Sequence, residues 1–208
     1  MQPQITTSWA WLKSNEPERA IKYLEKSLEI DEEIDDRRGQ AIDLNLLGNA
    51  CLKSNEYKKA IKYLEKSLEI DEEIGDRRSQ AVDLNLLGRV LEGLGNPREA
   101  IQYYEKSLQI SRDLKNIKGM SYNLYPLGQI YFDLGNYCKA KLHFKEFVDL
   151  PSSKNSWFLL NIFEMLGDIY KYEGGKTEAL ECYKKAMRLS KGEKMKELGK
   201  KIYELRND

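Results

Sequence analysis

Apolar residues recur along the chain at intervals of three and four positions, the spacing of one face of an α-helix. The pattern is clearest from residue 76 onward, where two such faces follow one another: Leu84, Leu87 and Leu91, then Ala100, Ile101, Tyr104 and Leu108. Gly95, Asn96 and Pro97 interrupt the run. Gly favours the left-handed conformation that ends a helix, Asn caps the next helix, and Pro suits its first position. The stretch therefore predicts two helices joined by a tight turn.

The same unit recurs along the chain with a period of 40 residues. Gly48, Gly88 and Gly128 are each 40 residues apart, and Gly167 follows 39 residues later. Residues 20–34 and 60–74 are the same string, AIKYLEKSLEIDEEI, which indicates a recent internal duplication. A fixed period of this length is typical of solenoids. We predict one solenoid domain over residues 1–208, with units at about 5–35, 36–75, 76–115, 116–150 and 155–190.

The two ends of the chain depart from the repeat. The first unit has a short first helix, at about 5–14, and a second helix at about 18–34. A last helix, at about 192–206, places four apolar residues on one side and Lys and Glu on the other: Met195, Leu198, Ile202 and Leu205. One apolar and one wet face suit the terminal cap of a solenoid. We therefore predict about eleven helices and no strand.

The repeated residues resemble the tetratricopeptide repeat (TPR). Its signature joins a large residue, Leu-Gly and Tyr in the first helix to Ala, an aromatic residue and Ala in the second. The fifth unit matches with Phe163, Leu166, Gly167, Tyr170, Ala179, Tyr183 and Ala186. The resemblance implies an all-α solenoid, a right-handed superhelix of antiparallel helix pairs. The usual period is about 34 residues, so the longer unit looks like the long-helix class of Pins/LGN-type scaffolds and prokaryotic signalling arrays.

Charge and composition narrow the function classes. Lys plus Arg and Asp plus Glu number 34 each, so no global field favours nucleic acid or an anionic membrane. No uncharged apolar run approaches 18 residues, and the first residues do not have the pattern of a signal peptide. We expect a cytoplasmic protein with no nucleic-acid or membrane partner. Cys51, Cys138 and Cys182 are interpreted as buried thiols, because their wide spacing does not suit a metal site.

In a TPR array the first helix of each unit lines the concave groove, and the resemblance implies that the exposed stripe of these helices binds a peptide. Asn45 and Asn85 occupy equivalent positions, and a carboxamide both donates to and accepts from a peptide backbone. The alternative is that Asn merely tolerates a wet face. The predicted peptide-binding residues are Arg38, Asn45, Asn49, Arg78, Asn85, Arg89, Tyr122, Tyr125 and Gln129.

Two subsets of the stripe have a specific chemistry and a specific alternative. Arg38, Arg78 and Arg89 would make part of the groove basic, so that it selects acidic residues; alternatively, the Asp-Arg-Arg sequences cap helices and pair locally. Tyr122, Tyr125 and Phe132 offer an aromatic patch beside Pro126, which removes a helical hydrogen bond. The alternative is that these aromatic rings pack on a neighbouring helix, and this interpretation is favoured for Tyr122.

No enzyme signature is present in the sequence. Residues 174–177, Gly-Gly-Lys-Thr, imitate only the end of a phosphate-binding loop, and the preceding residues are helical rather than a strand. His143, the single histidine, aligns with the packing position of Tyr103. We expect no cofactor and no catalysis. The sequence favours a non-catalytic scaffold with a protein or peptide partner that carries acidic residues. The alternative is a regulatory or self-association arm of a larger signalling protein.

Overall fold

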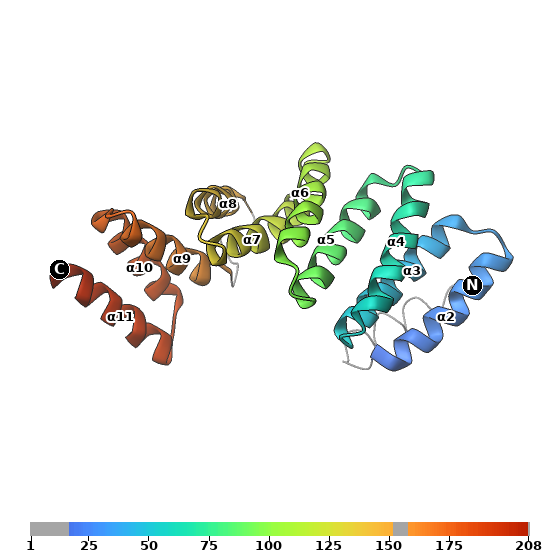
Figure 1. The fold of residues 1–208 in the computed structure, drawn as a ribbon, viewed down its shortest axis with the longest axis horizontal. Helices are drawn as coiled ribbons and strands as arrows, with labels where there is room; N and C mark the ends of the chain where they lie inside the picture. Colours follow the sequence, from blue (N-terminus) through green and yellow to red (C-terminus); the bar gives the residue numbers. More distant parts are fainter. Residues whose placement is uncertain (1–16, 152–157, 208) are drawn as a thin grey trace. The chain divides into compact units, whose positions relative to one another are not determined.

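The computed structural model describes residues 17–151 and 158–207, and this part of the chain contains ten α-helices and no strand. Figure 1 shows the helices following one another as antiparallel hairpins. Their bounds are α2 Pro17–Glu33, α3 Arg37–Lys53, α4 Tyr57–Glu73, α5 Arg77–Gly93, α6 Pro97–Asp113, α7 Ile117–Asp133, α8 Tyr137–Asp149, α9 Phe158–Tyr172, α10 Lys176–Leu189 and α11 Gly192–Asn207. The predicted all-α solenoid of helix pairs is confirmed. The predicted first helix, at about 5–14, lies outside the described residues.

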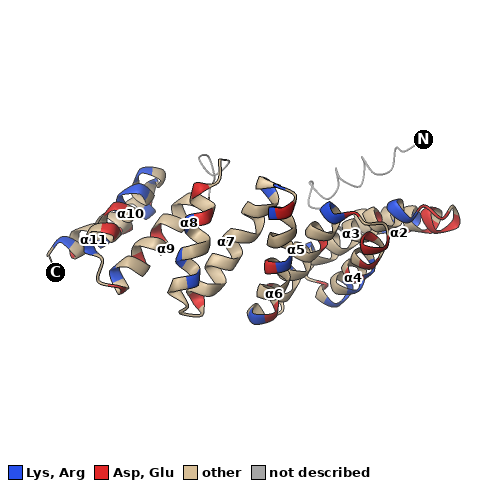
Figure 2. Ribbon diagram, turned by 90° about the horizontal axis from the view of Figure 1, so that it is seen from above, with Lys and Arg blue, Asp and Glu red and all other residues tan. Residues whose placement is uncertain are grey.

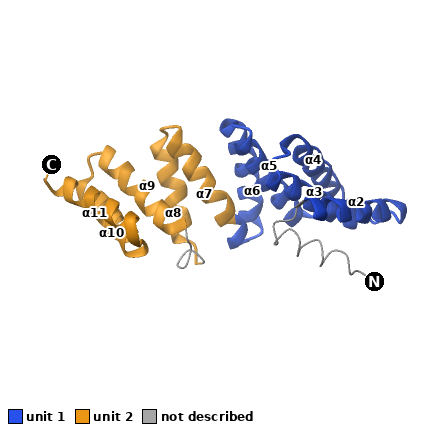
Figure 3. Cartoon of the chain, turned by 90° about the horizontal axis from the view of Figure 1, so that it is seen from below, with its two compact units in different colours: residues 1–119 blue, residues 120–208 orange. Residues whose placement is uncertain are grey.

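The chain divides into two compact units, residues 1–119 and residues 120–208 (Figure 3). The first unit carries α2 to α6, and the second carries most of α7 and then α8 to α11. The prediction that residues 1–208 act as one domain stays a prediction. In the repeats, α3, α5, α7 and α9 are the first helices of their pairs, and α2, α4, α6, α8 and α10 are the second helices.

The period of 40 residues follows from uniform helix lengths. Each helix from α2 to α7 has 17 residues, and three-residue turns separate them. The turns need one residue in the left-handed region, which Gly95 supplies at φ 78° and Asn55 at φ 58°. Pro97 begins α6 as predicted, but the side chain of Asn96 makes no capping hydrogen bond. The position of Asn96 is therefore right, and its predicted capping role is wrong.

Each helix pair closes through a small residue that faces a large one. On α5, a Cβ atom at Gly88 would lie only 2.8 Å from the ring of Tyr104 on α6. Gly48, Gly128 and Gly167 face Leu64, Phe144 and Tyr183 in the same way. Glycine therefore lets the two helices approach closely, and the buried large side chain fills the space between them. The same contact occurs in both units, which explains why glycine recurs once in every period of the sequence.

Two predictions of burial are wrong. Cys51 and Cys182 are buried, but Cys138 is exposed, because it lies two positions before buried Ala140 and so points to the opposite side of α8. On α11, Leu198, Ile202 and Leu205 are buried against α10, whereas Met195 remains 43% exposed. Met195 lies in the first turn of α11, at the edge of this contact.

Candidate functional site

The predicted stripe runs along the first helices on the side that alternates with the core. Leu44, Leu47 and Cys51 on α3 are buried, whereas Asn45 and Asn49 are partly exposed. The same alternation holds on α5 and α7. Every described stripe residue is at least partly accessible to solvent: Arg38, Ile42, Asn45, Asn49 and Leu52 on α3; Arg78, Val82, Asn85, Arg89 and Glu92 on α5; Lys118, Tyr122, Tyr125, Gln129 and Phe132 on α7; Asn161, Glu164, Asp168 and Lys171 on α9.

In the first unit, Asn45 joins two neighbouring first helices. Its side-chain Nδ2 donates a hydrogen bond to Oδ1 of Asp83 on α5 over 2.6 Å. The carboxamide is therefore partly engaged inside the protein, a role that neither interpretation of the sequence included. The partner, Asp83, has 0% of its surface exposed. Asn45 thus contributes to the contact between α3 and α5 as well as to the stripe.

Buried carboxyl groups lie next to this contact. Asp43 on α3, Asp71 on α4 and Asp83 on α5 are all at most 3% exposed. Burial raises the pKa of Asp43 to about 6. Burial likewise raises the pKa of both Asp71 and Asp83, because a charged carboxylate is poorly solvated inside the protein. The apolar pattern predicted which faces of the helices are buried. It did not predict that these acidic side chains are buried there as well.

The arginines of the stripe show the local pairing that the sequence left open. The carboxylate of Asp36 accepts from the backbone N–H of Gly39, and that of Asp76 accepts from the N–H groups of Arg78 and Ser79. These contacts cap α3 and α5. A guanidinium nitrogen of Arg38 also lies 3.5 Å from Oδ2 of Asp76. Three-quarters of the Arg38 side chain is still exposed, so it remains accessible to a partner. Figure 2 shows basic and acidic residues close together at the ends of these helices.

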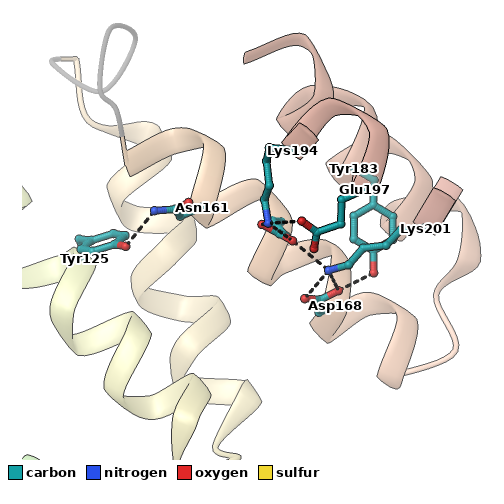
Figure 4. Close-up of polar contacts among 8 residues, drawn as sticks. Tyr125, Asn161, Asp168, Tyr183, Lys194, Glu197 and Lys201 are labelled. Atoms are coloured by element: carbon teal, nitrogen blue, oxygen red, sulfur yellow. Dashed lines mark hydrogen bonds and ion pairs between the residues drawn. The ribbon is translucent and has the colours of Figure 1, made fainter. Parts of the chain in front are cut away.

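In the second unit, the aromatic side chains of α7 divide into two groups. Tyr125 packs against Phe158, with ring centroids 4.3 Å apart, and its hydroxyl oxygen accepts from Asn161 over 3.3 Å (Figure 4). Phe132 packs against Tyr137. Packing against neighbouring residues is therefore observed for Tyr125 and Phe132. In contrast, 51% of Tyr122 is exposed. The helix continues through Pro126, which cannot donate to the carbonyl oxygen of Tyr122.

The acidic stripe residues of α9 are held by the last helix. Lys201 donates from Nζ to Glu164 and to Asp168, each over 3.0 Å, and Lys194 donates to Glu164 over 2.8 Å (Figure 4). Burial alone would raise the pKa of Glu164, but the hydrogen bonds from the two lysines outweigh it, and the pKa is lowered. Asp168 also accepts from the hydroxyl of Tyr183 over 2.7 Å. Glu164 and Asp168 therefore bind lysines of α11, and the sequence had predicted that the polar side of this helix faces solvent.

A pocket of about 240 Å³ opens on the first unit, away from the stripe. Its lining residues are Glu18, Ile21, Glu25, Cys51, Glu56, Lys59 and Tyr63. Cys51 stands where the next repeat has Leu91, so a small side chain replaces a large one at this level. Burial raises the pKa of the Cys51 thiol to about 11, aided by the nearby Glu56. A thiol that stays protonated is a weaker nucleophile than a thiolate.

The remaining sequence candidates have structural roles. His143 is buried, and its ring stacks on that of Tyr131 at 5.6 Å between centroids. The Gly-Gly-Lys-Thr segment follows α9 and begins α10, so a helix precedes it, whereas a phosphate loop follows a strand.

Within residues 17–151 and 158–207, no group of three acidic, histidine or cysteine side chains is placed to hold a metal ion. In the same residues, none of the helices combines the length and the apolar character needed to cross a membrane.

Comparison with known protein families agrees with the repeat geometry. Family models described as tetratricopeptide repeat match residues 12–73, 81–114, 123–153 and 160–193. The chain belongs to the tetratricopeptide repeat family. No curated protein matches it significantly in sequence.

Solved structures share the fold at low sequence identity. BtubC (BKLC) from P. vanneervenii superposes with a TM-score of 0.75 at 20% identity, over 87% of this chain and 76% of that one. YrrB, described as a TPR protein with an unusual peptide-binding site, gives a TM-score of 0.59 at 21% identity, over 91% and 86% of the two chains. A Rap protein complexed with Competence and Sporulation Factor gives 0.69 at 14% identity, over 96% of this chain and 62% of that one. At these identities the likeness establishes the fold.

Proposed function

We propose that this chain is a non-catalytic scaffold that binds an extended peptide, or an extended segment of a partner protein, along the stripe of its first helices. The observation that carries this proposal is the repeated exposure of polar and basic side chains on α3 and α5. On the opposite side of the same helices, apolar side chains are buried in every turn. TPR proteins such as YrrB are described as binding peptides, which supports the same use here.

The chemistry of the stripe in the first unit favours an acidic partner. Arg38, Arg78 and Arg89 are exposed on two successive first helices, and a guanidinium group binds a carboxylate through paired hydrogen bonds. Asn49 and Asn85 lie between them and are partly exposed. Their carboxamides would pair with the partner's backbone. Asn45 would contribute the part of its carboxamide that Asp83 does not engage.

The second unit would supply a separate, more apolar contact. Tyr122 and Gln129 are exposed on α7, whereas Tyr125 is largely committed to Phe158 and Asn161. We propose that Tyr122 and Gln129 contact a large apolar residue of the partner, with Tyr125 forming the base of that contact.

A second candidate function is that of a regulatory or self-association arm within a larger signalling protein. One comparison favours it: the chain spans 62% of the length of the Rap protein, which is described as complexed with Competence and Sporulation Factor. In this case the stripe would bind another part of the same protein or a second copy.

A peptide library tests the main proposal. We expect a randomised peptide library, selected on the full chain, to yield binders that share acidic residues. The double variant Arg78→Glu with Arg89→Glu should bind them about tenfold more weakly or worse, because each lost charge-assisted hydrogen bond is worth about 1.5–3 kcal/mol. Affinity should also fall with rising salt concentration in the wild type and less so in the double variant. Fluorescence anisotropy of a labelled binder measures both effects.

A control makes the same kind of substitution, at one position instead of two, on a second helix. Arg98 is exposed in the first turn of α6, so Arg98→Glu should leave affinity unchanged. Full affinity in the double variant would place the partner elsewhere and overturn the proposed site. A concentration-dependent dimer with no peptide binder would favour self-association instead.

A further inference from the structure

Two acidic side chains meet inside the first unit, where α4 packs on α5. Asp83 on α5 is 0% exposed and Asp71 on α4 is 3% exposed. The two carboxyl groups lie close enough for each to shift the pKa of the other. A carboxylate has only acceptors, so a hydrogen bond between two carboxyl groups requires a proton on one of them. Two buried carboxyl groups in contact cannot readily ionise together, because like charges repel strongly at this separation.

The surrounding donors indicate which group holds the proton. Oδ1 of Asp83 accepts from Asn45, whereas Oδ2 is buried and accepts no hydrogen bond. A proton on Oδ2 would make this oxygen a donor to Asp71. Asp71 lies closer to the positive charge of Arg38, which favours its ionised form, while Asp76 opposes it. These contacts favour a protonated Asp83 that donates to an ionised Asp71.

We propose that one proton, held between Asp71 and Asp83, is a structural part of the junction between α4 and α5 and makes the stability of the first unit depend on pH. Of the described residues, those that shift the pKa of Asp83 are Asn45, Ser67 and Asp71, and none of them carries a positive charge. From α3, Asp83 accepts from the amide of Asn45. From α4, Ser67 lies near it, but the Ser67 hydroxyl donates to the carbonyl oxygen of Ala41 over 2.9 Å. The hydroxyl of Ser107 on α6 donates to the carbonyl of Ala81 over 2.6 Å. Without a cation beside it, an ionised Asp83 would be poorly compensated.

The three positions of this arrangement recur one period earlier with the same residue types and one period later with neutral ones. Asp31, Ser27 and Asp43 stand one period before Asp71, Ser67 and Asp83, and both carboxylate oxygens of Asp43 are buried without a hydrogen-bond partner. One period later, both acids are replaced by uncharged residues, and the three positions hold Ser111, Ser107 and Asn123. Asn123 is 1% exposed and Ser111 is 1% exposed. The same fold thus accepts neutral side chains at this level, so packing does not require the acidic pair.

The direction of the pH effect follows from the proton that the native state retains. Burial raises the pKa of Asp83 to about 8, with a further rise from the neighbouring Asp71, while an Asp in the unfolded chain ionises near pH 4. Between these values the native state binds more protons than the unfolded state, so stability falls as pH rises. The loss is complete once pH passes the native pKa. Asp83 then releases its proton to solvent and faces ionised Asp71.

The test compares the full chain with the variant Asp83→Asn, which introduces the residue found at position 123. An Asn side chain accepts from Asn45 and donates to Asp71 without a titratable proton. Unfolding by urea would be measured from pH 4 to pH 9. The unfolding equilibrium constant of the wild type, divided by that of the variant, should rise by up to about tenfold per pH unit until about pH 8 and then level off. Asp35→Asn, at an exposed turn residue, is the matched control and should show the wild-type pH profile.

A second measurement keeps the proposal testable if the variant does not fold. The carboxyl carbon of Asp83, observed by NMR in the isotope-labelled wild type, should titrate well above the usual Asp range. Titration of Asp83 near pH 4 would overturn the proposal, as would an unchanged ratio of the two unfolding constants across the pH range.

Discussion

At the scale of single residues, two helical glycines have opposite surroundings. A Cβ atom added at Gly88 on α5 would meet the ring of Tyr104, whereas one added at Gly199 on α11 has no neighbouring atom within 4 Å. Gly88→Ala should therefore destabilise the protein by about 1–3 kcal/mol, the usual cost of overpacking. Gly199→Ala should stabilise it by about 0.5–1 kcal/mol, because alanine restricts the unfolded chain and favours the helix.

Urea unfolding of the two variants against the wild type measures both changes. Since the substitution is the same and both glycines are helical, helix propensity alone would shift both variants in the same direction. A stabilised Gly88→Ala would show that Tyr104 can move aside, and that the close approach of α5 and α6 is not needed for folding.

At the scale of elements, the last helix closes the second unit with a few buried side chains. Leu198 is fully buried with Ile202 and Leu205 against α10, while Met195 remains 43% exposed. Leu198→Ala should cost about 2–5 kcal/mol, as for other large-to-small changes in a core. Met195→Ala, the control, should change stability by less than about 0.5 kcal/mol. Thermal and urea unfolding measure both changes. Comparable losses of stability in the two variants would contradict the burial of Leu198, rather than Met195, against α10.

Repeat spacing predicted the elements well because it reports which side of each helix is buried. The helix pairs, the left-handed turn residues Gly95 and Asn55, and the burial of Gly88 against Tyr104 all follow from residues close in sequence or one period apart. Spacing does not show which polar side chains meet across repeats. The bond from Asn45 to Asp83 and the pairing of Lys201 with Asp168 depend on distances between helices, which the periodic pattern leaves open.

The candidate site was predictable in its position but not in its chemistry. The stripe was expected on the first helices, and its side chains are accessible there. Tyr125 was a candidate for contact with a partner, yet its ring packs on Phe158. Phe158 lies 33 residues away in the sequence, and no local or periodic pattern predicts this contact. The use of these residues in peptide binding stays a prediction.

At the scale of the whole molecule, the pKa of an acidic residue is shifted in each unit, and the two shifts have opposite directions. In the first unit, burial raises the pKa of Asp83, so its contribution to stability is lost as pH rises from about 4 to about 8. In the second unit, Lys194 and Lys201 lower the pKa of Glu164. The contribution of Glu164 is present above the pKa of the unfolded chain and is lost as pH falls through the lower native value. Each unit would therefore be least stable at a different end of the pH range.

The identical strings in α2 and α4 make chain length itself adjustable. Leu24 of α2 packs on Leu46, Leu47 and Ala50, and Leu64 of α4 packs on the equivalent residues of α5, Leu86, Leu87 and Val90. Joining residue 35 to residue 76 would thus place α2 on α5 with the surface that α4 now presents. We expect the chain lacking residues 36–75 to fold into a helical protein with a cooperative but lower melting transition.

Circular dichroism during heating measures that outcome. A chain lacking only residues 36–55 is the contrast, because it would bring two second helices together and should not melt cooperatively. A non-cooperative transition in the longer deletion would mean that α2 cannot replace α4. If the replacement succeeds, recombination between the two copies of the gene segment can shorten or lengthen this protein by whole periods, and natural variants of different length would need no new packing solutions.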